Sequence, residues 1–368
     1  MYITILQENF LKSIQDAGRF TAHKTQLPSL TGIYCQAKNG IITLRSTDLH
    51  IGYQTTVGAK VIEEGECVLP SKIVQEFISS LLAGPLELKT DKDSLTLIQG
   101  KKTSKIPLFS VNDFPPFPEF NGEKIVFDAQ NLTRALESCL YAASLDETRP
   151  VLASILWDMT SEGMTFVCTD GYRLSCVRET VSIELSKPQK LLLPAKGVGE
   201  ITSIINRQKS KKVSFGVSNE LSQSFFFVDD SIILLRLVDG EFPPYEQVIP
   251  RSFTFETGLD REEWMMALKT ALVFAKESSS IISLLFEDKE CIVRSASANL
   301  GEQETRISSS TAPSEQKKIS FNGRFLLDVL THLETPQVIF KMTDELKPGV
   351  ILAEGSEYPV NVVMPFKR

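Results

Sequence analysis

The sequence predicts an α+β fold made of three tandem repeats, each with two helices packed on a mostly antiparallel sheet. Three landmarks recur along the chain at a nearly constant spacing of 122 to 128 residues. Because separate landmarks agree on one spacing, we expect three domains, at residues 1–122, 123–250 and 251–368. The alternative is a single large α+β enzyme in which the repeats are coincidental.

The first landmark is the segment Thr169–Leu174, where charged and turn residues interrupt an otherwise apolar stretch. Gly171 can adopt a positive φ and Asp170 can close a local side-chain turn. The segment therefore predicts a strand, a tight bend and a second strand. The same strand followed by Thr-Asp occurs at Thr47 and Asp48, which is 122 residues earlier, and a weaker echo lies further along the chain.

The other two landmarks are a strand that leads into a helix and a proline-rich linker. The strand and helix start recur with offsets of 124 and 128 residues, as Leu69-Pro70-Ser71-Lys72, Leu193-Pro194-Ala195-Lys196 and Phe321-Asn322-Gly323-Arg324. The linker Asp113-Phe114-Pro115-Pro116-Phe117 returns 128 residues later as Glu241-Phe242-Pro243-Pro244-Tyr245. Each of the first two repeats therefore closes on a proline-rich connection, which is typical of a boundary between units.

A further helix opens each repeat, followed by short strands. Apolar residues recur at helical spacing over residues 8–20, 130–144 and 260–278. The segments between the helices are short and either alternate in polarity or run apolar, as in 165–177 and 232–238. Short strands at close spacing with two helices in each repeat are typical of an α+β domain.

The composition argues against several classes of protein. No window approaches eighteen uninterrupted apolar residues, and the start of the chain resembles no leader, so we expect a soluble cytoplasmic protein without a membrane partner. The six cysteines form no C-x-x-C pair and the three histidines are too few for an imidazole site, so we expect buried free thiols, no metal and no cofactor. The net charge of −7 argues against extensive basic patches but not against a local basic lining.

Motifs of catalysis give a weak signal. The run Gly100-Lys101-Lys102-Thr103 superficially suggests a phosphate loop, but Leu95 and Lys102 stand where that motif requires glycine and a hydroxyl residue. Asp48 and Asp170 could serve as paired carboxylates of a DNA-cleaving α+β enzyme, which is the alternative function. Both lie in equivalent turns of different repeats, so duplication explains them without chemistry. We therefore predict a protein that is not an enzyme and has no catalytic residues.

Taken together, the repeats and motifs resemble the bacterial DNA polymerase III beta subunit family, the sliding clamps. The resemblance spans the whole chain, with the motifs in the family's order. It is carried by the triplication and by Leu27-Pro28-Ser29-Leu30, Thr169–Leu174, Leu237–Pro243 and Val362-Val363-Met364-Pro365. It implies three DNA-clamp domains, a head-to-tail homodimer that forms a ring around duplex DNA, and a role as a polymerase processivity factor.

A ring that slides must hold DNA by topology and weak phosphate contacts, because contacts to bases would arrest it. The basic residues that match family positions are Lys24, Lys72, Arg149 and Lys196, and Lys72 and Lys196 occupy the same place in successive repeats. A basic residue of this kind, judged alone, is more often an ordinary exposed surface residue. The most basic run, 207–212, is interpreted as an exposed turn between a helix and a strand, and its role stays open.

The resemblance also implies a groove that binds short extended peptides of partner proteins, namely the replicative polymerase, the clamp loader and other DNA-processing proteins. Aliphatic, proline and methionine side chains suit an apolar cavity, and the tail serves as one wall; it could also be a plain edge strand. The family often has His at Tyr172, Arg at Gln247 and Met-Arg-Leu at Phe366-Lys367-Arg368, so the peptide preference stays open. The matching residues are Leu152, Thr169, Gly171, Tyr172, Arg173, Leu174, Pro243, Gln247, Val248, Asn322, Phe325, Val362, Met364, Pro365 and Phe366.

The dimer interface implied by the resemblance joins the first domain of one copy to the third domain of the other. Ile106 and Leu108 lie on a late strand of the first domain. Val273 and Phe274 lie at the end of the first helix of the third domain. Burying such side chains contributes roughly 1.5 to 3 kcal/mol each, so they could hold a ring closed.

Overall fold

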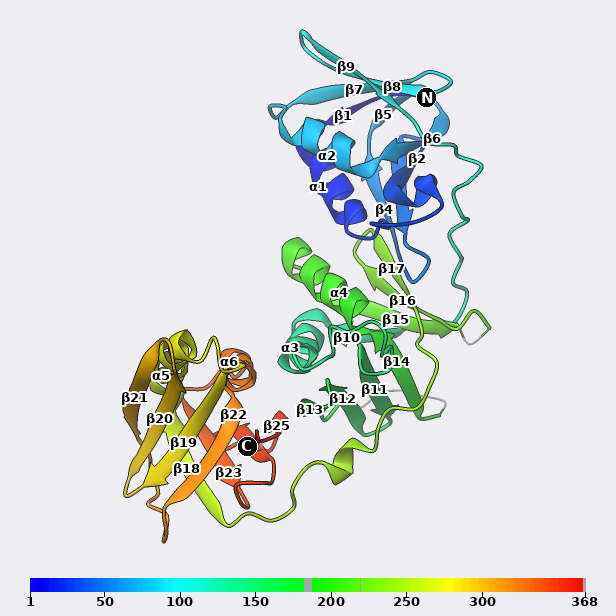
Figure 1. Ribbon diagram of the computed structural model, residues 1–368. Coiled ribbons are helices and arrows are strands. Elements are labelled where there is room, and N and C mark those ends of the chain that lie inside the picture. Colours follow the sequence, from blue (N-terminus) through cyan, green and yellow to red (C-terminus); the bar gives the residue numbers. More distant parts are fainter. Residues whose placement is uncertain (182–186, 219, 367–368) are drawn as a thin grey trace. The chain divides into compact units, whose positions relative to one another are not determined.

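The structure is a computed structural model that describes residues 1–181, 187–218 and 220–366 (Figure 1). Its order of helices and strands confirms the triplication, because a strand followed by a helix opens each repeat and a second such pair follows. The opening helices are α1 (Gln7–Gly18), α3 (Ala129–Leu140) and α5 (Arg261–Phe274). The second helices are α2 (Ser71–Ser79), α4 (Ala195–Gln208) and α6 (Gly323–Thr331). The repeats are therefore structural and not coincidental.

The chain separates into two compact units, and the first comprises Met1–Leu132 and Glu200–Leu237. It holds a five-stranded and an eight-stranded sheet, and α1 and α2 pack against each other in it. The smaller sheet has the order β5 (Lys60–Glu63), β1 (Tyr2–Leu6), β7 (Pro85–Thr90), β8 (Ser94–Gln99), β9 (Lys102–Pro107). The larger has the order β10 (Ile125–Asp128), β15 (Lys212–Ser218), β16 (Gln223–Val228), β17 (Ser231–Arg236), β4 (Ile51–Gly58), β3 (Ile41–Thr47), β2 (Gly32–Lys38), β6 (Gly65–Pro70).

The second unit comprises Thr133–Gly199 and Val238–Arg368, and again holds an eight-stranded and a smaller sheet. Helices α5 and α6 pack against each other in it. The eight-stranded sheet has the order β14 (Gln189–Pro194), β11 (Ser154–Thr160), β12 (Gly163–Thr169), β13 (Arg173–Glu179), β25 (Val360–Val363), β24 (Gly349–Ala353), β23 (Gln337–Met342), β18 (Phe255–Asp260). The four-stranded sheet has the order β21 (Gly301–Ser308), β20 (Glu290–Ser297), β19 (Ile281–Glu287), β22 (Lys317–Asn322).

All strand pairings among the residues that the structure describes are antiparallel, and the two eight-stranded sheets each draw strands from two successive repeats. In the first, β4 pairs with β17 so that Gly52 lies opposite Leu234. In the second, β13 pairs with β25 so that Leu174 lies opposite Val362. Since these sheets run on across the repeats, the compact units do not coincide with the predicted segments 1–122, 123–250 and 251–368, whose boundaries stay a prediction.

The helices bury one apolar stripe each against these sheets, as their sequence period predicts. In α1 the stripe is Phe10, Ile14 and Ala17, all fully buried, and the ring of Phe20 stacks on Tyr53 at 5.0 Å between centroids. In the second unit Trp264 of α5 meets Phe340 edge to face at 6.0 Å. Aromatic pairs of this kind add about 0.5 to 1.5 kcal/mol beyond the area that they bury.

Helix α5 is shorter than the predicted segment 260–278 because the backbone turns left-handed soon after it. It begins where the carboxylate of Asp260 accepts the N–H of Glu263, which is an N-cap. It ends at Phe274, and Ser279 and Ser280 then have φ of 55° and 62°, which no helix can continue. The hydrophobic period extends past the helix because Ala275 is buried as well.

The predicted turn at Gly100 and the buried free cysteines are confirmed, since Gly100 has φ of 59° in the connection between β8 and β9. The predicted turn 207–212 is shorter than expected: only residues 209–211 connect α4 to β15, because Arg207 and Gln208 still belong to the helix and Lys212 begins the strand. All six cysteines are free and buried. In the part of the chain that the structure describes, no helix has both the length and the apolar character needed to cross a membrane.

Candidate functional site

The segment Thr169–Leu174, called the bend from here on, is closed by its own side chains. The Asp170 carboxylate accepts the N–H groups of Tyr172 at 2.9 Å and Arg173 at 3.0 Å. The Thr169 hydroxyl accepts from Gly171 N–H at 3.1 Å and donates to the Arg173 carbonyl at 2.6 Å. Gly171 has φ of 93°, and a side chain there would meet open space. The backbone at Gly171 is therefore open to a ligand.

The corresponding turn of the first repeat has the same hydrogen bonds. The Asp48 carboxylate accepts the N–H groups of His50 and Ile51, at 2.9 and 2.8 Å. The Thr47 hydroxyl accepts from Leu49 N–H and donates to the Ile51 carbonyl. Four bonds reproduced 122 residues apart show that Asp48 and Asp170 are turn-forming residues. Their lone pairs serve the backbone, so paired catalytic carboxylates are not needed to explain them.

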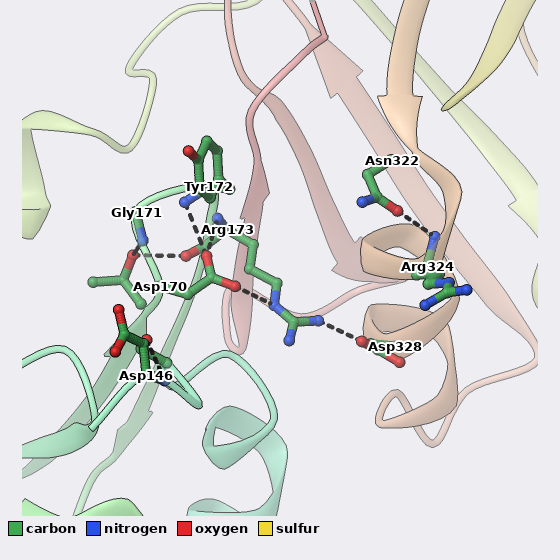
Figure 2. A network of polar contacts seen from close by, with 10 residues as sticks. Asp146, Asp170, Gly171, Tyr172, Arg173, Asn322, Arg324 and Asp328 are labelled. Carbon is green, nitrogen blue, oxygen red and sulfur yellow. Dashed lines mark hydrogen bonds and ion pairs between the residues drawn. The ribbon is translucent and has the colours of Figure 1, made fainter. Parts of the chain in front are cut away.

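Arg173 joins the bend to helix α6 (Figure 2). Its Nε lies 3.0 Å from the Asp170 carboxylate and its terminal nitrogen donates to the Asp328 carboxylate. The guanidinium also lies over the ring of Phe325, 4.7 Å from its centre, and its side chain is only 11% exposed. Arg173 was predicted to line the groove. Its contacts lie mostly inside the protein, where it links the bend to α6.

Residues 362–366, called the tail, are held on both sides. The N–H of Met364 donates to the Tyr172 carbonyl at 2.8 Å, which continues the pairing of β25 with β13. The N–H of Phe366 donates to the Ser320 carbonyl of β22 at 2.7 Å. Since β22 leads into α6 and its predicted groove residues Asn322 and Phe325, the tail bridges the bend and this helix. Lys367 and Arg368, which belong to the departure from the family ending, lie outside the described residues.

Residues 238–253, called the strap, cover one face of the eight-stranded sheet in the second unit. Phe242, Tyr245, Ile249 and Phe253 of the strap pack on a buried apolar cluster. The cluster comprises Leu156, Val167, Leu174, Cys176, Leu192, Val350 and Val362. Burial raises the pKa of Tyr245 to about 12, so its hydroxyl is neutral at physiological pH. The structure thus brings the bend, the strap and the tail together on one apolar base.

The predicted groove residues divide into a floor and exposed walls. Leu174 and Val362 are 3% and 1% exposed, and Thr169 is also buried, so these residues lie below the surface. Tyr172 is 63% exposed, and Val248, Met364 and Phe366 are each about two-fifths exposed. Pro243 and Gln247 are exposed as well, whereas Leu152, Asn322, Phe325 and Pro365 are half-buried. A ligand would therefore first meet the walls.

A hollow of about 510 Å³ lies beside Pro243 and Gln247 on the β14 side of the strap. Leu156 and Leu192 of the sheet and the aromatic residues of the strap give it an apolar lining. Of the predicted groove residues, Pro243 and Gln247 line it. Sequence reasoning missed the rest of this hollow; the repeated linker motif at Glu241–Tyr245 was the signal that could have pointed to it.

The matching place in the first unit is filled by the chain itself. Gly52 and Leu234 pair there as Leu174 and Val362 do in the second unit. The ring of Phe117, from the linker 109–124, lies 3.3 Å from where a side chain on Gly52 would begin. The first repeat therefore has the same turn, but its own aromatic side chain occupies the space above the floor.

The four predicted DNA-binding residues are all exposed, in keeping with contact to phosphates. Lys72 lies in the first turn of α2 and lines a hollow together with His23, the neighbour of Lys24. Lys196 holds the equivalent place in α4. Arg149 is paired with Asp146 at 3.1 Å, and hydrogen bonds from Thr148 and Arg149 hold the pKa of Asp146 below its usual value. In the basic run 207–212, Arg207 is engaged with Asp16 at 2.6 Å, and burial raises the pKa of that carboxyl.

The predicted interface residues lie at or near the two sheet edges. Ile106 is on β9 and is already buried, while Leu108, just beyond the strand, is half-buried. Val273, at the end of α5, is 53% exposed and Phe274 is half-buried. Strand β9 ends the five-stranded sheet and β21 ends the four-stranded one. Of the four residues, Val273 has the most surface to give to a partner.

Three repeats with two helices each, and antiparallel sheets that continue from one repeat into the next, define the class of DNA sliding clamps. Models of the DNA polymerase III beta subunit match almost the whole chain, with the N-terminal domain at residues 1–118, the central domain at 127–244 and the C-terminal domain at 246–367. The chain belongs to this family of beta sliding clamps, which are DNA polymerase processivity factors and not enzymes.

Individual relatives match over their full length. The beta sliding clamp of Chlamydia muridarum is 26% identical over 361 residues, 98% of this chain and 96% of that protein. The beta sliding clamp of Staphylococcus aureus is 24% identical over 378 residues, 100% of this chain and 99% of that protein. The crystal structure of the DNA polymerase III beta subunit from Thermotoga maritima is 25% identical with a TM-score of 0.92, covering 100% of this chain and 99% of that one. The sliding clamp of Bacillus subtilis shares the fold at 21% identity and a TM-score of 0.92, with the same coverage.

Proposed function

We propose that two copies of this chain close head to tail into a ring that encircles duplex DNA. The observation that carries this proposal is the pair of open sheet edges. The repeat offsets show that β9 of the first repeat corresponds to β17 of the second and β25 of the third. In the same way, β21 of the third repeat corresponds to β4 of the first and β13 of the second. Within the chain, β4 pairs with β17 and β13 with β25, so β21 of one copy and β9 of another would pair in the same way. Edge strands offer rows of backbone donors and acceptors to such a partner.

The charges of the two edges suit this pairing. Strand β9 carries Lys102 and Lys105, whereas β21 carries Glu302 and Glu304 beside Arg306. Glu304 is engaged by Arg294 at 2.7 Å, which leaves Glu302 as the exposed carboxylate nearest the start of that strand. Opposite charges steer association and fix register more than they add affinity. Leu108, Val273 and Phe274 would add apolar area beside the paired edges, and Ile106 would support β9 from within.

The ring would hold DNA without reading its sequence. Lys24, Lys72, Arg149 and Lys196 are exposed and would contact phosphates, while an overall charge of −7 keeps the rest of the protein from binding nucleic acid. The domains proposed for this assembly are 1–122, 123–250 and 251–368. The bend, strap and tail would bind apolar peptides of the replicative polymerase, the clamp loader and other DNA-processing proteins in the cytoplasm.

Two measurements test the ring. Light scattering should give twice the mass of one 41.0 kDa chain. Clamp loaded onto a nicked circular DNA should stay bound in high salt and be lost when the circle is linearised, because topology and not phosphate contact retains it. Equal loss from both DNA forms, or a monomer at working concentrations, would contradict the proposal.

A further inference from the structure

The proposed peptide groove has exposed charges of opposite sign at its two ends. At the strap end, Glu241 and Glu246 are exposed and, together with Gln247, line the hollow. At the helix end, Arg324 is exposed in the first turn of α6, where its backbone N–H donates to the side-chain oxygen of the groove residue Asn322 (Figure 2). The exposed side chains of Tyr172 and Met364 belong to the bend and the tail, whose backbones are joined by a hydrogen bond.

Two other charged groups near the groove are already engaged. The guanidinium of Arg173 is held by Asp170 and Asp328, so its charge is balanced inside the protein. Lys190 lines the hollow, but its ammonium lies 3.2 Å from the Asp158 carboxylate. Glu241, Glu246 and Arg324 are exposed instead, so an incoming peptide would meet their charges.

The hollow at the strap end suits a long basic side chain. Leu156, Leu192 and the ring of Tyr245 line it with apolar surface, and the two carboxylates stand on the same lining. A lysine or arginine can lay its aliphatic stem along such surface and keep its charge beside the carboxylates. A glutamate or aspartate entering there would meet like charges and would bury its carboxylate against apolar atoms.

We propose that the groove is electrically polar and selects extended apolar peptides that carry a basic residue at the strap end and an acidic residue at the α6 end. This inference rests on the proposed peptide-binding function and names the chemistry of its ligand. The basic residue enters the hollow beside Glu241 and Glu246, and the acidic residue lies beside Arg324. The apolar core of the peptide covers the bend and the tail between them.

The test uses two peptides of identical composition, with one apolar core flanked by lysine and glutamate in opposite orders. At low salt the wild-type clamp should bind one of them about fivefold tighter, because swapping the flanks replaces two weak attractions by two repulsions. The difference should shrink as salt is raised, since the pairs are exposed. In the E241K/E246K variant the preference should disappear or reverse.

The control is the E119K/E123K variant, which makes the same change of net charge on the linker 109–124 of the first repeat, where both glutamates are exposed. It should keep the wild-type preference. Equal affinity of the wild-type clamp for both peptides would overturn the inference while leaving the groove in place, and so would a preference lost in both variants. Failure of both peptides to bind any clamp would instead contradict the proposed groove itself.

Discussion

Replacing Arg173 by Ala should loosen the contact between the bend and α6 more than any other single change at this site. The ion pair with Asp170 is 11% and 16% exposed on its two sides, so breaking it leaves a mostly buried carboxylate without its cation. Such a loss costs about 3 to 5 kcal/mol, and we take the lower value because Asp170 keeps two backbone N–H bonds. The half-exposed Asp328 adds about 0.5 to 1 kcal/mol, and the contact with Phe325 about as much again.

Hydrogen exchange of the backbone amides in α6 and at Tyr172 measures this loss as a free energy of local opening. The expected loss of about 4 kcal/mol corresponds to exchange that is roughly a thousandfold faster. Asp328→Asn should cost only about 1 kcal/mol, since Asp170 still pairs with the guanidinium. Arg178→Ala is the matched control, because Arg178 lies on the same strand, is exposed, and contacts only the ring of Tyr358 among the interactions described, at 4.9 Å. A loss below about 1 kcal/mol for Arg173→Ala, or equal losses for the arginine and Asp328 variants, would refute this reasoning.

Three further predictions address the groove, the interface and pH. Deleting residues 364–368 removes one wall of the groove and its bond to Tyr172, so a fluorescent apolar clamp-binding peptide should lose about 2 kcal/mol or more, or thirtyfold in Kd. Circular dichroism should show that the variant is folded and light scattering that it is a dimer; unchanged affinity in such a protein would place the site elsewhere. Changing Val273 and Phe274 together to Ala should shift the dimer toward monomer in sedimentation, and a wild-type dissociation constant would exclude them from the interface. Burial raises the pKa of Cys176 to about 12, so the folded state holds a proton that the unfolded state releases above about pH 8.5. The free energy of unfolding should therefore fall by up to about 1.4 kcal/mol per pH unit from pH 9 toward 12. Over that range Cys176→Ala should show a shallower fall of the melting temperature than the wild type, whereas parallel curves would contradict the assignment.

The local structure of this protein could be read from its sequence because the signals are short-range. The helix that follows Leu69–Pro70 begins at Ser71 as the repeated motif indicated, and its counterparts begin at Ala195 and Gly323. The turns at Asp48 and Asp170 follow from side chains that bond to backbone two and three residues away. Such interactions depend only on neighbouring residues, so one sequence suffices to predict them.

The groove was reached by another route. The bend and the tail lie more than a hundred positions apart along the chain, and only the resemblance to a known family placed them beside each other. The pairing of Leu174 with Val362 confirms that these two segments meet. The role of Arg173 could not be foreseen, because its partner Asp328 is 155 residues away and carries no signal of its own in the sequence.

By itself the sequence determined the triplication, the α+β class and the turns at Asp48 and Asp170, since these rest on periodicity and local backbone chemistry. Only the tertiary structure decided that sheets continue from one repeat into the next and that Glu241 and Glu246 share a hollow with Leu156 and Leu192. It also decided that Phe117 fills the space above Gly52 in the first unit, whereas the walls of the corresponding groove in the second unit stay exposed. The physical reason is that strand pairing and side-chain packing join residues that are far apart along the chain. The residues next to each partner in the sequence do not indicate which distant segment it will meet.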